Sequence, residues 1–204
     1  SGAIAGVREI LATYTLPAGY TTRLEGQFLA QEQASSLILW LSLLSLALIF
    51  AVLYTRYRSA TLAFIIMVNV PLALVGAVAA LWLAGQPLSV ASLVGFVTLA
   101  GIATRNGIML VSHIKHLEEH EGVTDFREAV FRGAMERLAP ILMTALAAGL
   151  ALIPLAISGD KPGNEIQTPM AIVILFGLLT SMLLNMLIVP ALYLRFGRPV
   201  QMAQ

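Results

Sequence analysis

One arginine, Arg105, ends an uncharged run of 46 residues that begins after Arg58. A charge at the centre of a membrane span costs roughly 2.5–3.5 kcal/mol, so such a side chain is expected to face the interior of a helix bundle beside an acidic partner. No Asp or Glu lies in the apolar runs of the chain. The pattern therefore predicts an ion pair whose carboxylate belongs to another part of the protein. The alternative is that Arg105 reaches the headgroups, which requires it to cover about 15 Å of helix.

Polar side chains accompany Arg105 along its helix. Asn106 flanks it, while Thr98, Gly101 and Ser112 lie close to the same helical stripe. Small and polar residues on one stripe are typical of a face that packs against neighbouring helices. Together with Arg105, they predict a buried polar face, and ordinary helix packing without transport is the alternative.

Thr144 is the only polar residue in the apolar run 138–157. Its hydroxyl could serve a polar pathway through the membrane. The alternative is a hydrogen bond to the carbonyl of Pro140, one turn earlier in its own helix.

Three histidines, His113, His116 and His120, share one helical face and could bind a transition metal. The alternative is a polar helix end that leaves the membrane. Several methionines could bind Cu(I), although methionine is also a common packing residue. No nucleophile–base pair, phosphate loop or zinc-protease spacing is present in the sequence. A transporter without a cofactor or resident metal is therefore favoured over an enzyme.

The composition of the 204 residues is that of a membrane protein, because 58% are hydrophobic and only 11% are charged. The net charge of +1 gives no basic field for nucleic acid. The chain has no cysteine, which excludes disulfides and Cys-ligated metals.

Charge-free stretches predict an all-α membrane protein with five spans. A crossing takes about 20 apolar residues. The long run before Arg105 is divided by Gly85, Gln86 and Pro87, which favour a turn. The spans are expected at roughly 34–54, 60–84, 88–117, 139–157 and 169–195.

Basic residues predict the orientation of these spans. The first and third connections and the C-terminal tail hold eight Lys and Arg residues, whereas the second and fourth connections hold only Lys161. The positive-inside rule places the eight in the cytoplasm. The transmembrane domain is then 31–198, with segment 1–30 outside and a cytoplasmic tail at 199–204.

Two further segments have patterns of their own. Segment 1–30 predicts one helix and one short strand, a remnant that needs partners from elsewhere. This outside segment has no visible signal peptide, which favours a piece of a longer protein. Segment 124–136 predicts a short amphipathic helix at the cytoplasmic interface, with Thr124 as its N-cap.

Several motifs resemble the C-terminal part of resistance-nodulation-division (RND) efflux pumps, closest to their heavy-metal branch. They are LPAGY at 16–20, GQF at 26–28, VPLALVG at 70–76, GIATRNGIML at 101–110, RLAPILMT at 137–144 and VPA at 189–191.

The resemblance implies that the five spans are the eighth to twelfth of twelve in a bacterial inner-membrane protein. Segment 1–30 is then the end of a periplasmic porter domain. In this family, aspartates on the fourth helix pair with a basic residue on the tenth, at the position of Arg105. Asn106, Thr144 and Arg137 match polar positions of the same proton pathway. The implied assembly is a homotrimer with a periplasmic adaptor and an outer-membrane channel.

Heavy-metal members often carry an uncharged or acidic residue where Arg105 stands. This departure argues against metals as the cargo, whereas the GQF motif at 26–28 favours the metal branch. We expect a proton-driven exporter of heavy-metal cations, with two alternatives. One is a truncated or accessory subunit that does not transport alone, and the other is an exporter of hydrophobic drugs.

Overall fold

The computed structural model describes residues 27–86, 88–121, 123, 125–159, 163–164 and 166–197. These residues form six helices and no strand: α2 (Gln27–Tyr57), α3 (Ala60–Met67), α4 (Asn69–Leu83), α5 (Val90–Glu119), α6 (Phe126–Ile157) and α7 (Gln167–Phe196). Since α3 and α4 form one crossing, five spans are long and apolar enough for a membrane. The all-α class and the five spans are thus confirmed. The helix and strand expected before residue 27 lie outside the described residues.

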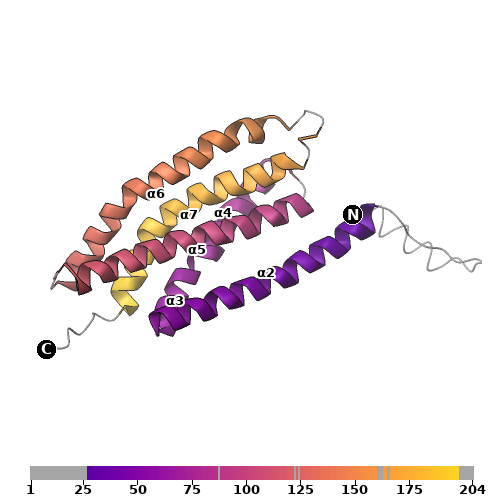
Figure 1. Ribbon diagram of the computed structural model, residues 1–204. Helices are drawn as coiled ribbons and strands as arrows, with labels where there is room; N and C mark the ends of the chain where they lie inside the picture. Colours follow the sequence, from indigo (N-terminus) through magenta and orange to yellow (C-terminus); the bar gives the residue numbers. More distant parts are fainter. Residues whose placement is uncertain are drawn as a thin grey trace, which may run out of the picture.

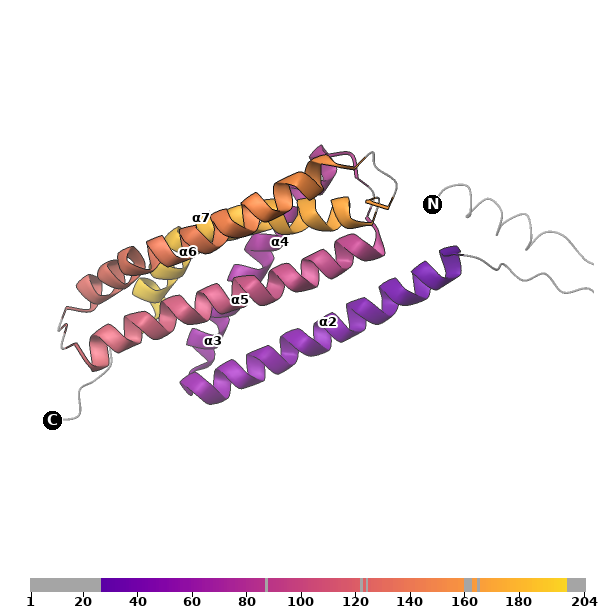
Figure 2. The same cartoon turned by 45° about the horizontal axis from the view of Figure 1, so that its top comes forward.

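Helix α7 is the central element of the bundle. It packs against α4, α5 and α6 (Figure 1), and half of its most apolar stretch is buried. Helix α2 is the opposite case, because only 6% of its most apolar stretch is buried. It contacts α3 and α5 and stands apart from α6 and α7 in both ribbon views (Figure 2). The polar and charged residues on α5 and α6 are therefore held by a four-helix core to which α2 is only loosely joined.

The second span is divided into two helices, which the sequence did not predict. Helix α3 ends at Met67, and α4 begins at Asn69 after Val68. Pro71 explains the break, because it has no N–H for the carbonyl of Met67 and its ring crowds that carbonyl. The interruption places Asn69 at a buried helix start in the middle of the span.

Helix α6 differs from the expected pair of helices at 124–136 and 139–157, because it continues without interruption from Phe126 to Ile157. Its N-cap is Asp125, whose side chain accepts a hydrogen bond from the backbone N–H of Arg127 at 2.9 Å. Thr124, the expected cap, lies outside the described residues. The early turns pack on α5 rather than along a surface, since Gly133 sits directly against Ile114. Arg137 and Leu138, which lie between the two expected helices, are good helix formers, so the helix continues through them.

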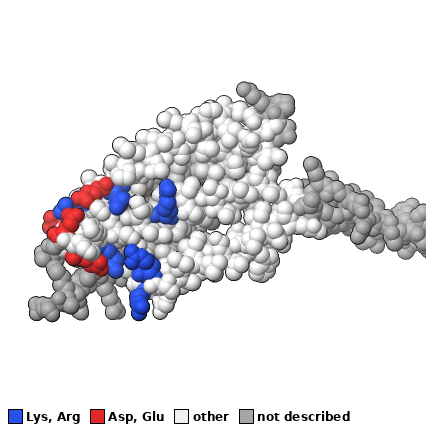
Figure 3. Space-filling view, viewed as in Figure 1, with Lys and Arg blue, Asp and Glu red and all other residues white. Residues whose placement is uncertain are grey.

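Charged side chains gather at the end of the bundle where α5 leads into α6, while the middle of the surface is largely uncharged (Figure 3). An ion-pair network holds this polar end. Arg132 pairs with Glu136 at 2.7 Å and with Glu121 at 3.0 Å, and His113 contacts Glu136 at 2.7 Å. The network joins α5 to α6 at the charged end of the bundle, beyond the apolar part of both helices.

Candidate functional site

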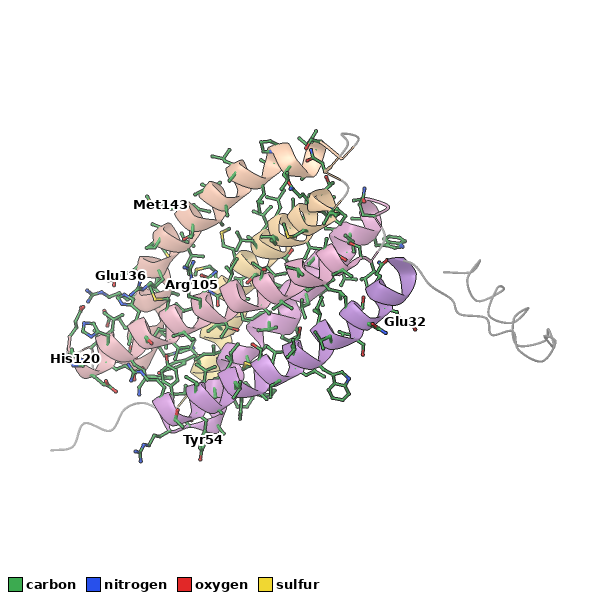
Figure 4. All side chains as sticks on the ribbon, turned by 45° about the vertical axis from the view of Figure 1, so that its right-hand side comes forward. Glu32, Tyr54, Arg105, His120, Glu136 and Met143 are labelled. Carbon is green, nitrogen blue, oxygen red and sulfur yellow. The ribbon has the colours of Figure 1, made fainter. Side chains whose placement is uncertain are left out.

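Helix α5 carries the intramembrane arginine. It begins with a capping box, in which Ser89 and Ser92 bond reciprocally to each other's backbone N–H groups. Arg105 lies part-way along the helix on the side toward α6 (Figure 4). Its side chain is exposed, and no ion pair or hydrogen bond joins it to any residue that the structure describes. A cation is thus presented on the membrane-spanning surface of the bundle.

Asn106 points in a different direction from Arg105. It is buried, as is Thr104, whose hydroxyl donates to the carbonyl of Ala100 at 2.8 Å. Successive helical residues are about 100° apart, so one helix presents an arginine outward and an asparagine inward. The polar face predicted around Arg105 is therefore divided between the surface and the core.

Helix α6 carries the other two predicted residues. Thr144 is exposed, and its hydroxyl donates to the carbonyl of Pro140 at 2.5 Å. This is the local hydrogen bond that the sequence offered as the alternative. Arg137 is half-buried, and its Nε atom is buried without a hydrogen-bond partner among the described residues. A buried guanidinium donor without a partner costs free energy, so Arg137 is suited to bind an acceptor from another part of the protein.

The four predicted residues therefore lie on two neighbouring helices, α5 and α6, which pack side by side. No hydrogen bond among the described residues joins them to one another. Apart from Glu32 near the start of α2, the described carboxylates all lie between Glu118 and Glu136, at the polar end. Within the described chain, the apolar part of the bundle thus offers arginines and no carboxylate.

A buried asparagine pair was missed in the sequence. The Nδ2 atom of Asn69 donates to the carbonyl of Ala103 at 2.8 Å and to Oδ1 of Asn185 at 3.2 Å. Both asparagines are fully buried. The sequence feature that could have predicted the pair is a single asparagine in each of two apolar runs, because polar residues within spans usually face the bundle interior. Because Ala103 is two residues from Arg105, this contact fixes the part of α5 that carries the arginine.

We expect Asn69→Leu to lower the stability of the protein by about 0.6–2 kcal/mol, the range measured for interhelical hydrogen bonds in membranes. The variant loses both bonds and leaves Oδ1 of Asn185 without its donor. Thermal unfolding of the purified protein in detergent measures the change. Thr98→Val is the control, because its hydroxyl bonds only to Val94 in its own helix. Equal stability of the two variants would show that the asparagine pair does not hold the bundle.

The three histidines are not gathered into one site. His113 contacts Glu136 of α6, whereas His116 stacks on His120 with their ring centres 4.8 Å apart. The part of the chain that the structure describes holds no group of three side chains that could bind a metal. The methionines are dispersed as well, and Met143 lies on the outer side of α6 with 71% of its surface exposed (Figure 4). The three histidines thus have separate partners among the described residues.

The chain matches a known family of proteins over nearly its whole length. A family model described as the AcrB/AcrD/AcrF family matches residues 1–197. The chain belongs to this family. Because the match covers nearly the whole chain, it includes every helix described above. The multi-pass membrane architecture is therefore the family's own, and the resemblance to RND efflux pumps is confirmed.

Individual members of the family are similar to the chain over most of its length. The cobalt-zinc-cadmium resistance protein CzcA of Cupriavidus metallidurans is 36% identical over 87% of this chain and 16% of its own length. The nickel and cobalt resistance protein CnrA of the same species is 40% identical over 87% of this chain and 16% of its own. For the nickel-cobalt-cadmium resistance protein NccA of Alcaligenes xylosoxydans xylosoxydans, the identity is 39% over 90% of this chain and 17% of its own length.

A solved structure supports the fold. A crystal structure of a heavy metal efflux pump matches with a TM-score of 0.79 and 33% identity, covering 97% of this chain and 20% of the pump. The chain thus spans about a sixth of the length of the curated relatives and a fifth of this pump.

Proposed function

We propose that the chain is the C-terminal membrane portion of a proton-driven RND exporter of heavy-metal cations. The observation that carries the proton-driven part of this proposal is the exposure of Arg105 on the spanning surface of α5, with no described carboxylate at its depth. A lone cation is costly in hydrocarbon, and a carboxylate from another helix would offset that cost. Arg105 would be the basic member of an ion pair whose acidic member, on another helix, takes up the proton.

The proposed mechanism is a change in this pairing. While the partner carboxylate is ionised, it holds Arg105 and stabilises one packing of the bundle. Protonation neutralises the carboxylate and leaves the arginine without its counter-charge, so a second packing becomes more stable. Arg137 and Thr144 on α6 and Asn106 on α5 would provide the polar surroundings through which the proton reaches the pair.

The proposed cargo rests on the relatives, whose names specify resistance to cobalt, zinc, cadmium and nickel. The proposed orientation places segment 1–30 in the periplasm and the polar end of the bundle, with the C-terminus, in the cytoplasm. As in other RND exporters, the complete protein would work as a homotrimer with an adaptor and an outer-membrane channel. A second candidate, export of hydrophobic drugs, is favoured by Arg105 itself, because drug-exporting members of the family commonly carry a basic residue there.

Expression of the complete gene in a bacterium that lacks its own metal exporters tests the cargo. We expect tolerance to Co²⁺, Ni²⁺, Zn²⁺ or Cd²⁺ to rise, while tolerance to hydrophobic drugs stays unchanged. The reverse pattern would support the drug exporter. No change in either tolerance, with the protein present in the membrane, would favour the accessory subunit.

A further inference from the structure

A small cavity lies where the end of α2 meets the end of α5, outside the site described above. Its volume is about 160 Å³, and its walls come from Arg56 and Tyr57 of α2, from Ser112, Lys115, His116 and Glu119 of α5, and from His120 directly after α5. The walls are mostly hydrogen-bonding groups, in contrast to the apolar surface along the rest of α2.

Tyr57 is the fixed centre of this cavity. The ring is buried, and its hydroxyl lies 2.7 Å from the Oγ atom of Ser112, which ties α2 to α5. Two cations lie by the same ring, since the guanidinium carbon of Arg56 and the Nζ atom of Lys115 are each 5.9 Å from its centre. Cation–π attraction of this kind holds both positive groups at the cavity.

The charges around the cavity favour an anion. Glu119 lies 3.4 Å from Lys115 and offsets part of its charge, whereas Arg56 has no ion pair among the described residues. His116 and His120 stack beside them and can donate further hydrogen bonds. One guanidinium, one ammonium and two imidazoles therefore face a single carboxylate, and the balance is positive.

The position of the cavity specifies the source of the anion. It lies at the end of the first span, within the charged end of the bundle (Figure 3). Basic side chains at the end of a span reach the level of the lipid headgroups. Val52 and Tyr54, just before it on α2, are more than half exposed. Arginine and lysine at this level attract the phosphates of anionic lipids.

An apolar groove runs along the same side of α2, toward the middle of the membrane. Its volume is about 320 Å³, and its lining includes Ile38, Leu46 and Ile49 of α2, Leu74 of α4, and Phe96 and Val97 of α5. Ile49 is seven residues before Arg56, which is about 10 Å along the helix. The groove thus begins at a depth that an acyl chain reaches from a headgroup at the cavity.

We propose that the cavity binds the phosphate of an anionic lipid, such as phosphatidylglycerol, and that an acyl chain of the same lipid lies in the groove between α2, α4 and α5. Bound in this way, the lipid fills the space beside the most weakly packed helix of the bundle. The site is independent of Arg105 and of the proposed proton pathway.

Native mass spectrometry of the purified protein, in the longest form that its gene encodes, tests this site. Phosphatidylglycerol and phosphatidylcholine are added separately in neutral detergent, and the retained lipid is counted. We expect selective retention of phosphatidylglycerol. Arg56→Gln and Lys115→Gln should each reduce this retention about fivefold, because a basic side chain at a membrane surface contributes about 1 kcal/mol toward an anionic lipid.

Arg195→Gln is the matched control, because Arg195 is exposed at the same end of the bundle, on α7, and does not line the cavity. The variant Arg56→Lys/Lys115→Arg, which keeps both charges, should retain selectivity. Equal retention of the two lipids by the unmodified protein, or an equal loss in Arg195→Gln, would overturn the proposal. Displacement of phosphatidylglycerol by millimolar inorganic phosphate would also overturn it, by making the soluble ion the ligand.

Discussion

Replacing Arg105 by alanine should reduce cation export by about 100-fold while leaving the amount of inserted protein unchanged. An unpaired arginine at mid-span costs roughly 2.5–3.5 kcal/mol, and its pairing can contribute a free energy of that size to the change between the two packings of the bundle. A free energy in this range changes the equilibrium constant between the packings by roughly 70- to 400-fold. Alanine removes that energy difference between the two packings. Insertion should not suffer, because the variant has one charge fewer to place in hydrocarbon. Metal export from loaded cells, normalised to the protein in the membrane, measures the effect.

Two control variants separate the loss of the charge at position 105 from the loss of an arginine elsewhere. Arg105→Lys keeps a positive charge at the same depth and should retain a measurable part of the export, although lysine lacks the planar fork of arginine. Arg127→Ala removes an exposed arginine at the polar end of α6 and should leave export unchanged. If Arg105→Ala exports at the unmodified rate, Arg105 has no part in coupling and the proposed mechanism fails.

Replacing Gly177, which is buried in α7, by leucine should strongly destabilise the bundle. A Cβ atom at this position would overlap the side chain of Leu99 and lie 3.0 Å from the Cβ atom of Ala77. Leu99 and Ala77 are both fully buried, so neither can move away into lipid. Inserting a large side chain into a packed core costs about 1–3 kcal/mol and occasionally more. For a chain of this size, the upper figure lowers the midpoint of thermal unfolding by about 6–12 °C.

Gly101→Leu is the matched control for Gly177→Leu. It places the same residue in a helix interior, but no heavy atom lies within 4 Å of the added Cβ. Both changes gain the same helix propensity over glycine, so the difference between them reports packing alone. Unfolding midpoints in detergent that differ by less than a degree would contradict the close approach of α7 to α4 and α5.

The sequence predicted the spans well because their signal is local. Uncharged runs of the right length require no knowledge of neighbours, and every expected span overlaps an observed one. The break at Val68 was also local, since Pro71 lies three residues later. It was missed because a proline near a helix start and a proline within a long span give the same pattern until the helix boundaries are known.

The remaining features depend on contacts between helices. The early turns of α6 pack on α5 through Gly133 and Ile114, a contact that the amphipathic pattern alone could not reveal. Likewise, Asn69 and Asn185 are 116 positions apart, so only the fold shows that they meet. Arg105 was identified from its type and depth, but the sequence could not give its direction, because both a buried and a surface-facing arginine fit the same spacing.

Proton coupling of cation transport is the central claim, and reconstituted vesicles test it most directly. The complete protein is placed in vesicles that contain a metal-sensitive dye and a pH indicator, and a pH gradient is imposed across the membrane. The proposal predicts that Co²⁺ or Zn²⁺ moves against the proton flux, that an ionophore which collapses the gradient stops this movement, and that Arg105→Ala moves neither ion. Cation movement that persists at the same rate without a pH gradient, or in Arg105→Ala, would contradict it.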